Sequence, residues 1–146
     1  MKVDITEVKG KFISAIKELK LKNTKQRMQV LETFFENEGH KNVDDVYRFV
    51  KKKNPKIGYA TVHRTLSLLN KIGIIEATKI GSQKILYEHK YAHSHHDHLV
   101  CTKCGKIIEV ESENLESLQN EIAKKNKFKV LDHKLIIYGL CRKCRH

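Results

Sequence analysis

The sequence predicts an α+β protein of two small domains, the first mainly helical and the second built mainly from strands. Helical periodicity runs through roughly the first 70 residues, and two short strand-like segments follow. The pattern then changes to strands around two Cys-x-x-Cys pairs. A chain of 146 residues is long enough for one ordinary domain or two small ones.

The first two helices are predicted by apolar side chains that recur every three or four residues. The first helix is expected over residues 5–19, and the second begins after Thr24, whose hydroxyl suits a helix N-cap. The expected inward-facing side chains are Val8, Phe12, Ile16 and Leu19 in the first helix, and Met28, Leu31 and Phe35 in the second.

Two further helices complete the first half of the chain. Asn42 and Asp45 have the spacing of a capping box, and the helix that they begin ends before Pro55, the only proline. Its expected inward side chains are Val43, Val46, Phe49 and Val50. The next helix is expected over residues 59–71, after Gly58, with an apolar face (Val62, Leu66, Leu69) and a polar one (Tyr59, His63, Arg64, Ser67).

Two strand-like segments, residues 74–79 and 83–88, follow these helices and meet around Gly81 and Ser82. Helices followed by a β-hairpin have the order of a winged helix-turn-helix. In such domains the helix before the hairpin usually enters the major groove of DNA. The alternative is a small helical domain that merely has a polar face.

The second half of the chain predicts a small α/β arrangement. Strands are expected over residues 98–101 and 106–110, on either side of Cys104 and Gly105. One helix is expected over residues 113–126, with Leu115, Leu118 and Ile122 facing inward, and residues 128–138 form a last extended stretch.

The charge of the chain is strongly positive and unevenly distributed. Twenty-nine basic and 17 acidic residues give a net charge of +12. Residues 1–90 hold 19 basic and 10 acidic residues, a net +9, whereas residues 91–146 hold 10 and 7, a net +3. Such a field attracts polyanions, because basic side chains near phosphates release condensed counterions. Together with the helix order, the charge favours double-stranded DNA as a partner over a merely solvated surface.

The N-terminal sequence reads as an amphipathic helix without the continuous apolar region of a signal peptide. No apolar run approaches the roughly 20 residues that span a bilayer. We therefore expect a cytoplasmic protein with no membrane partner. In that compartment the four cysteines are expected to hold a metal ion rather than to form disulfides.

The cysteines form the sharpest chemical motif of the chain. Cys101 and Cys104 make one Cys-x-x-Cys pair, and Cys141 and Cys144 make the other. Four thiolates suit tetrahedral Zn²⁺ and leave no open position, so the predicted site is structural. The 36 residues between the pairs imply that the site ties the C-terminal tail to the first turn of the second domain. The alternative is disulfides or free thiols.

Four histidines lie within six positions, His93, His95, His96 and His98, with Asp97 among them. Alternate residues of an extended segment face opposite sides, so His96 and His98 are expected on one side and His95 and Asp97 on the other. One strand could then serve two metal sites. Imidazole and carboxylate ligands suit Fe²⁺, Mn²⁺, Zn²⁺, Co²⁺ and Ni²⁺ without choosing among them. The remaining ligands are candidates elsewhere: His40, Glu88, Glu109, Glu116 and His133.

These residues together resemble the ferric uptake regulator (Fur) family over nearly the whole chain. The similar segments are residues 24–27 (Thr-x-Gln-Arg), 60–66 (Ala-Thr-Val-His-Arg-Thr-Leu), 95–106 (from His-His-Asp-His to Cys-Gly-Lys) and 138–144 (Tyr-Gly-Leu-Cys-x-x-Cys). The resemblance implies a winged-helix DNA-binding domain (residues 1–88), a hinge (89–96) and an α/β dimerisation and metal-binding domain (97–146). It also implies a transcriptional repressor that binds palindromic operators as a homodimer.

Site residues carried over from the family fall into three sets. The resemblance implies a regulatory metal site made by His40, Glu88, His96, His98 and Glu109. It implies a second metal site made by His95, Asp97, Glu116 and His133. It also implies DNA contacts by Lys22, Tyr59, Thr61, His63 and Arg64, four of them on the recognition helix.

The chain departs from the family pattern at two places. His63 stands where the family usually has tyrosine, which leaves the base preference at that position open. The segment between Glu88 and the histidines is slightly longer than the family pattern, so His89 competes with Glu88 as the hinge ligand.

Iron, zinc, manganese, nickel and peroxide sensors share this scaffold. Peroxide sensors tend to carry Asp at the positions of Glu88 and Glu109, so two glutamates favour Fe²⁺ sensing, with Mn²⁺ or Zn²⁺ as alternatives. A zinc-uptake or peroxide-responsive regulator is the alternative within the family. Two alternatives lie outside the family. A metal-dependent nuclease or hydrolase would need a metal site with a coordination position open to water. A metal-storage protein would bind metal without any effect on DNA affinity.

Overall fold

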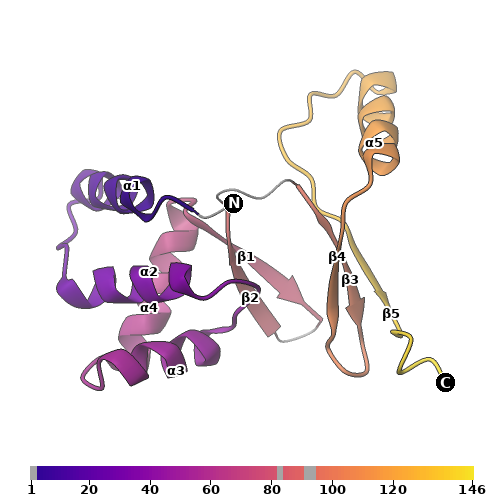
Figure 1. The fold of residues 1–146 in the computed structure, drawn as a ribbon. Helices are drawn as coiled ribbons and strands as arrows, with labels where there is room; N and C mark the ends of the chain where they lie inside the picture. Colours follow the sequence, from indigo (N-terminus) through magenta and orange to yellow (C-terminus); the bar gives the residue numbers. More distant parts are fainter. Residues whose placement is uncertain (1–2, 82–83, 91–94) are drawn as a thin grey trace. The chain divides into compact units, whose positions relative to one another are not determined.

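The computed structural model describes residues 3–81, 84–90 and 95–146. The chain divides into two compact units, residues 1–92 and 93–146, each described here by itself (Figure 1). The domain and hinge boundaries implied by the resemblance stay a prediction. Ser82 and Gln83 of the expected hairpin, and His93 of the histidine-rich segment, lie outside the described residues.

The first unit begins with four helices, α1 (Ile5–Glu18), α2 (Lys25–Glu36), α3 (Val43–Lys53) and α4 (Tyr59–Lys71). Three of them begin at a side-chain cap. The Asp4 carboxylate accepts from the amide of Thr6, and the Thr24 hydroxyl accepts from the amide of Arg27. The expected N-cap at Gly58 of α4 is confirmed, although glycine offers no side-chain hydrogen bond there.

The capping box of α3 is confirmed. The side chain of Asn42 accepts from the amide of Asp45 at 2.8 Å, and the carboxylate of Asp45 accepts from the amide of Asn42 at 3.1 Å. Each contact satisfies an amide that the helix itself leaves unpaired.

Replacing the cap is expected to weaken this unit measurably. Asn42→Ala should lower its free energy of unfolding by about 1 kcal/mol, because the amide of Asp45 loses its acceptor. Urea unfolding monitored by circular dichroism measures the change, with Asn23→Ala, an exposed asparagine before α2, as the control. An equal loss in both variants would contradict the capping role.

The hydrophobic core of the chain lies in the first unit. Its fully buried side chains come from all four helices, from β1 and from the turns before α4 and β1: Val8, Phe12, Ile16, Val30, Leu31, Phe34, Val46, Val50, Ile57, Val62, Leu66, Leu69, Ile74 and Ile75.

The expectations about inward-facing side chains are confirmed in part. Leu19 is exposed, because α1 ends one residue before it. On α2, Val30 and Phe34 are fully buried, whereas the expected Met28 and Phe35 are partly buried and pack against this core. Phe34 and Phe35 are adjacent aromatics, and a three- or four-residue spacing fits either of them. Phe49 of α3 is also only half-buried.

The strands β1 (Ile75–Ile80) and β2 (Lys84–His89) pair antiparallel, with Ile75 opposite His89 and Ile80 opposite Lys84. Lys41, before α3, extends this ribbon by one bridge to Tyr87. Helices followed by this hairpin make the expected winged helix-turn-helix, so the fold class of the first unit is confirmed.

The second unit is a small α/β domain. Its strands β3 (Asp97–Cys101), β4 (Ile107–Val110) and β5 (Ile136–Gly139) form one sheet in the order β4-β3-β5, and α5 (Glu113–Lys125) lies between β4 and β5 in sequence. β3 pairs antiparallel with β4 and parallel with β5. Of the stretch 128–138 that was expected to be extended, only its end, from Ile136 on, is a strand.

The second unit carries its apolar side chains largely on its surface. Leu118 and Ile122 were expected to face inward, yet they are 53% and 54% exposed, and no residue of α5 is buried. On the sheet, Ile108, Leu99 and Ile137 stand opposite one another and are all exposed. Among the described residues of this unit, the buried hydrophobic side chains are those of Val100 and Cys101. The apolar side chains that recur at helical spacing in α5 therefore form a face that the single chain does not bury.

In the described part of the chain, every helix is too short or too polar to cross a lipid bilayer.

Candidate metal centres and DNA-binding surface

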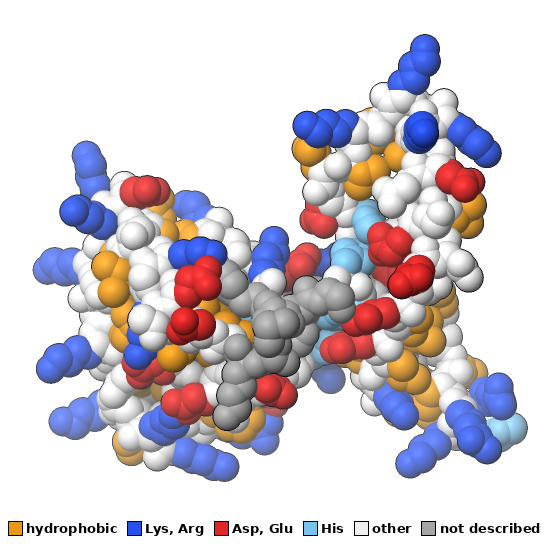
Figure 2. Space-filling view, turned by 45° about the horizontal axis from the view of Figure 1, so that its top comes forward, with side chains coloured by type: hydrophobic (Ala, Val, Ile, Leu, Met, Phe, Trp, Pro, Cys, Tyr) orange, Lys and Arg blue, Asp and Glu red, His pale blue; other side chains and the backbone are white. Residues whose placement is uncertain are grey.

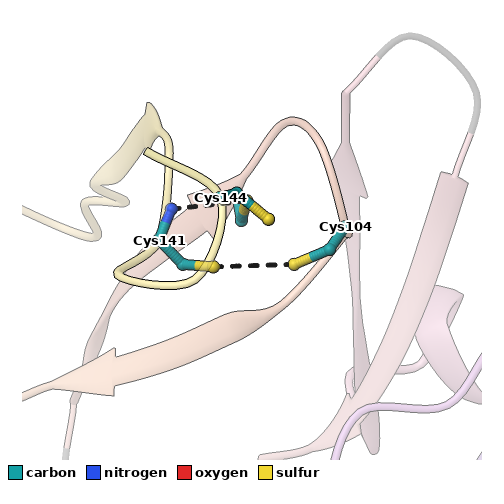
Figure 3. A group of neighbouring side chains, drawn as sticks. Cys104, Cys141 and Cys144 are labelled. Atoms are coloured by element: carbon teal, nitrogen blue, oxygen red, sulfur yellow. Dashed lines mark hydrogen bonds between the residues drawn. The ribbon is translucent and has the colours of Figure 1, made fainter. Parts of the chain in front are cut away.

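The four cysteines converge at one end of the second sheet. The parallel pairing of β3 with β5 sets Cys101 opposite Gly139, so the turn after each strand delivers its Cys-x-x-Cys pair to the same place. The four sulfur atoms lie within 4.8 Å of one another, and none forms a disulfide. Figure 3 shows the side chains of Cys104 and Cys141 pointing toward each other, with their sulfurs 3.7 Å apart. Tetrahedral Zn–S bonds of about 2.3 Å require sulfurs about 3.8 Å apart.

Both cysteine turns are closed by backbone hydrogen bonds. The amide of Gly105 donates to the carbonyl of Cys101 at 2.9 Å, and the φ of Gly105 is +74°, a value that glycine adopts without strain. The second turn closes when the amides of Cys144 and Arg145 donate to the carbonyl of Cys141 at 2.8 and 3.0 Å. The two turns therefore hold their sulfurs in place through the backbone.

The thiols of this group have very different proton affinities. The amide of Cys141 donates to the sulfur of Cys101 at 3.4 Å, and this is the main reason why the pKa of Cys101 falls to about 6. The pKa of Cys144 rises to about 12, mainly through its hydrogen bond with Cys141. The Cys101 thiol therefore loses its proton more readily than the Cys144 thiol, and a metal ion bound by all four thiolates would displace the protons that remain.

A second group joins His95, Asp97, Glu116 and His133 within the second unit. Ligand atoms of His95, Asp97 and His133 lie within 4.8 Å of one another. The Oε1 atom of Glu116, on α5, is 3.0 Å from Nδ1 of His95 and 3.0 Å from Nε2 of His133. Asp97 is only 4% exposed, and its Oδ1 atom has no hydrogen-bond partner among the described residues. A buried carboxylate oxygen without a donor suits a cation.

Each unit also assembles part of the proposed regulatory set. In the first unit, Nε2 of His40 is 3.1 Å from Oε2 of Glu88, and both side chains are largely buried. In the second unit, the rings of His96 and His98 are 4.9 Å apart, and Nε2 of His96 is 3.9 Å from Oε1 of Glu109. The strand register explains this grouping, because His98 stands opposite Glu109.

The β2 strand separates the two candidate hinge ligands. Neighbouring residues of a strand face opposite sides. Glu88 contacts His40, whereas His89 is buried and its ring packs against Phe35 at a centroid distance of 5.5 Å. The geometry within the first unit therefore favours Glu88 over His89 as a ligand.

The outer face of α4 is polar and open to solvent. Tyr59, His63 and Arg64 are exposed, and Thr61 is half-buried. The opposite face is anchored in the core by Val62, Thr65, Leu66 and Leu69. Lys22 lies exposed before α2, and its carbonyl accepts from the guanidinium of Arg27 at 2.6 Å. Lysine and arginine side chains project from the surface of both units (Figure 2).

The sequence matches known proteins along most of its length. Residues 18–138 match the model of the ferric uptake regulator family. The chain is 36% identical over 134 residues to the "Ferric uptake regulation protein" of Neisseria gonorrhoeae, covering 91% of this chain and 92% of the relative. It is 41% identical over 127 residues to the protein of the same name from Bacillus subtilis, covering 84% of this chain and 85% of the relative.

The fold is similar to that of solved regulators. The ferric uptake regulator of Helicobacter pylori, described as having three functional metal-binding sites, superimposes with a TM-score of 0.88 at 28% identity, covering 99% of this chain and 96% of that one. The peroxide stress regulator of Campylobacter jejuni superimposes with a TM-score of 0.67 at 29% identity, covering 97% and 99%. Similar folds therefore serve regulators of different signals.

Proposed function

The chain belongs to the ferric uptake regulator family of transcription regulators, and from this premise we propose that it is an iron-responsive transcriptional repressor acting in the cytoplasm. Family members are transcription regulators and not enzymes, which removes the nuclease or hydrolase hypothesis. The observation that carries the proposal is the distribution of side chains that can ligate a metal ion: His40 pairs with Glu88 in the first unit, and His96 and His98 lie near Glu109 in the second.

The regulatory site is proposed to draw on both units. His40 and Glu88 form a pair in the first unit, and His96, His98 and Glu109 form a trio in the second. Two or three protein donors leave coordination positions of a transition-metal ion open to water or to further ligands. We propose that side chains of the other unit fill these positions, because simultaneous ligation would fix the angle between the units.

Fixing that angle would regulate DNA binding through geometry. The two recognition helices of a dimer must stand about one helical turn apart, ~34 Å, to enter successive major grooves on one face of DNA. Without a shared metal the two units would sample many angles, and few of them would match a palindromic operator. The metal can raise the affinity for DNA only by as much as the metal itself binds the DNA-binding arrangement more tightly than the other arrangements.

DNA recognition is assigned to the exposed face of α4 and to Lys22. Tyr59, His63 and Arg64 present polar groups to solvent from a helix whose other face is buried in the core. Arginine can make two hydrogen bonds to guanine, and imidazole can both donate and accept. Thr61 is half-buried between the two faces and would contribute a contact at the edge of this surface.

Members of this family bind DNA and work as dimers. In this chain, the exposed row of Ile108, Leu99 and Ile137 and the exposed α5 residues Leu118 and Ile122 give the second unit an apolar surface. Burying such a surface against a second copy would supply the core that the unit lacks. We therefore assign the homodimer interface to this surface.

Charge on that surface is expected to separate the dimer. Ile137→Glu should give a monomer with strongly reduced operator affinity, because a desolvated carboxylate would oppose association. Gel filtration with light scattering measures the mass, and Asn114→Glu, which places the same charge at an exposed position on the first turn of α5, is the control. A dimeric Ile137→Glu protein would contradict this assignment.

Two further metal sites accompany the regulatory one in the proposal. Zn²⁺ in the four-cysteine group would be structural, because four thiolates leave no coordination position open. The group of His95, Asp97, Glu116 and His133 would hold a second ion, an assignment supported by the buried Oδ1 atom of Asp97.

A metal panel tests the proposed function. Operator affinity is measured with Fe²⁺, Mn²⁺, Zn²⁺ or Ni²⁺ added to the zinc-containing dimer, and bound metal is counted per chain. We expect Fe²⁺ to raise the affinity with one ion taken up at the regulatory site, as the two glutamates and the relatives named ferric uptake regulation protein suggest. A response to Zn²⁺ alone would indicate a zinc-uptake regulator, and loss of binding on peroxide treatment a peroxide-responsive one. Metal uptake without any effect on operator affinity would instead indicate a metal-storage protein.

A further inference from the structure

The first unit buries a lysine beside its proposed metal ligands. Lys41 is 3% exposed, and no other lysine or arginine is buried among the residues that the structure describes. Lysine is almost never fully buried unless its charge is paired or hydrogen-bonded, because removing an ammonium group from water is costly. Burial lowers the pKa of Lys41 to about 8, an effect that Glu38 and Asp45 partly offset.

The ammonium group of Lys41 closes the turn that follows α2. Its Nζ atom donates to the carbonyl of Gly39 at 2.9 Å and to the carbonyl of Asn37, and it lies 4.4 Å above the ring of Phe34. The side chain of Asn37 in turn donates to the carbonyl of Thr33 at 2.7 Å. Carbonyl groups at the end of a helix lack intrahelical donors, so a cation placed there satisfies them and favours the helix dipole.

The backbone of Lys41 connects this turn to β2. Its amide donates to the carbonyl of Tyr87 at 3.0 Å, and its carbonyl accepts from the amide of Tyr87 at 2.7 Å. The residues next to this pair are His40 and Glu88, whose side chains meet at 3.1 Å. Lys41 therefore contacts the turn of residues 37–40 through its side chain and β2 through its backbone. His40 is the last residue of that turn and precedes Lys41 directly.

We propose that Lys41 is a positioning residue, whose buried ammonium group holds the turn of residues 37–40 so that His40 stays against Glu88 and the regulatory site is preorganised. This inference rests on the proposed function, because it gives His40 and Glu88 their role as ligands. Residues that orient metal ligands without touching the metal change metal affinity roughly 10- to 100-fold when they are replaced.

The test compares two substitutions at this position. Lys41→Met keeps the length of the side chain and removes the charge and the donors, and Lys41→Arg keeps the charge and the donors. Both are made in a His133→Ala background, so that the second metal group does not bind, and the four-cysteine site is loaded with Zn²⁺ beforehand. Mn²⁺ affinity is measured by electron paramagnetic resonance. We expect Lys41→Met to weaken Mn²⁺ binding about 10- to 100-fold, and Lys41→Arg to lose much less.

A double-mutant cycle with His40→Ala separates positioning from general damage to the fold. If Lys41 acts through His40, Lys41→Met causes no further loss of Mn²⁺ affinity once His40 is gone. Losses that add, or Lys41→Met with wild-type affinity, would overturn the inference. If Lys41→Met does not fold, as judged by circular dichroism, the same cycle is run with Lys41→Gln, which is uncharged but retains a donor.

The outcome for His40→Ala alone tests the proposed function separately. Unchanged Mn²⁺ affinity in that variant would remove His40 from the regulatory site, whatever Lys41→Met does. Weakened binding in His40→Ala combined with normal binding in Lys41→Met would overturn only the role of Lys41.

Discussion

His96→Ala is expected to abolish metal-dependent operator binding while leaving the structural zinc and the dimer intact. His96 sits beside His98 and Glu109, and its ring is one of only three donors that the second unit offers to the regulatory set. Removing a direct ligand should weaken metal binding by at least about 100-fold, since even residues behind the ligands contribute 10- to 100-fold. Operator binding at a fixed Fe²⁺ concentration should then fall to its metal-free level.

The control for this variant is His146→Ala, which removes an exposed imidazole from the end of the chain. Both proteins should retain one Zn²⁺ per chain and the mass of a dimer. If His96→Ala bound the operator as tightly as the unchanged protein and with the same metal dependence, the regulatory role of this group would be refuted.

Cys104→Ser is expected to have the largest effect on the fold of the second unit. The β3 and β5 strands share only a short parallel ladder, from His98–Ile136 to Cys101–Gly139, and this unit buries little apolar surface. Structural Zn²⁺ contributes on the order of 10 kcal/mol or more to the folding of small domains. Without it, the β5 strand should detach and the dimer should dissociate.

Zinc content, gel filtration and thermal unfolding measure these effects together. Lys103→Ser is the matched control, because it changes an exposed residue of the same turn and keeps all four thiols. Stripping Zn²⁺ from the unchanged protein with a chelator should reproduce the behaviour of Cys104→Ser. A zinc-free Cys104→Ser protein that kept its dimer and its unfolding temperature would show that the four-cysteine group is not structural.

Local sequence signals predicted the helical unit well. The capping box at Asn42 and the bounds of α4 depend on residues close in sequence, and both are confirmed. The choice between Phe34 and Phe35 could not be made in this way, because packing against other helices decides which of two adjacent aromatics is buried.

The second unit shows where the hydrophobic period misleads. Leu118 and Ile122 have the spacing of a buried helix face, yet they are exposed. The period identifies a face that avoids water, but it does not say whether the same chain or a second copy covers it. Residues 128–135 were expected to be extended, but none of them belongs to a strand of the described chain.

The metal groups were predictable to different degrees. The strand period assigned His96 with His98 and His95 with Asp97, and the contacts in the second unit have the same grouping. That these groups bind metal, and which metal each binds, stays a prediction. Lys41 could not be singled out, because it lies between elements and one lysine among many looks like surface charge. Only its burial, through contacts with residues of α2 and β2, distinguishes it.

The spacing of the two DNA-binding units in the dimer can be measured with one spin label per chain. A label introduced as a non-natural amino acid at Lys52, an exposed residue of α3, leaves the cysteines untouched. Pulsed electron resonance gives the distribution of label–label distances before and after metal is added. If ligands from both units share one ion, a broad distribution should become narrow on adding a diamagnetic ion such as Zn²⁺, and His96→Ala should stay broad. Identical distributions with and without metal would contradict the metal-controlled geometry.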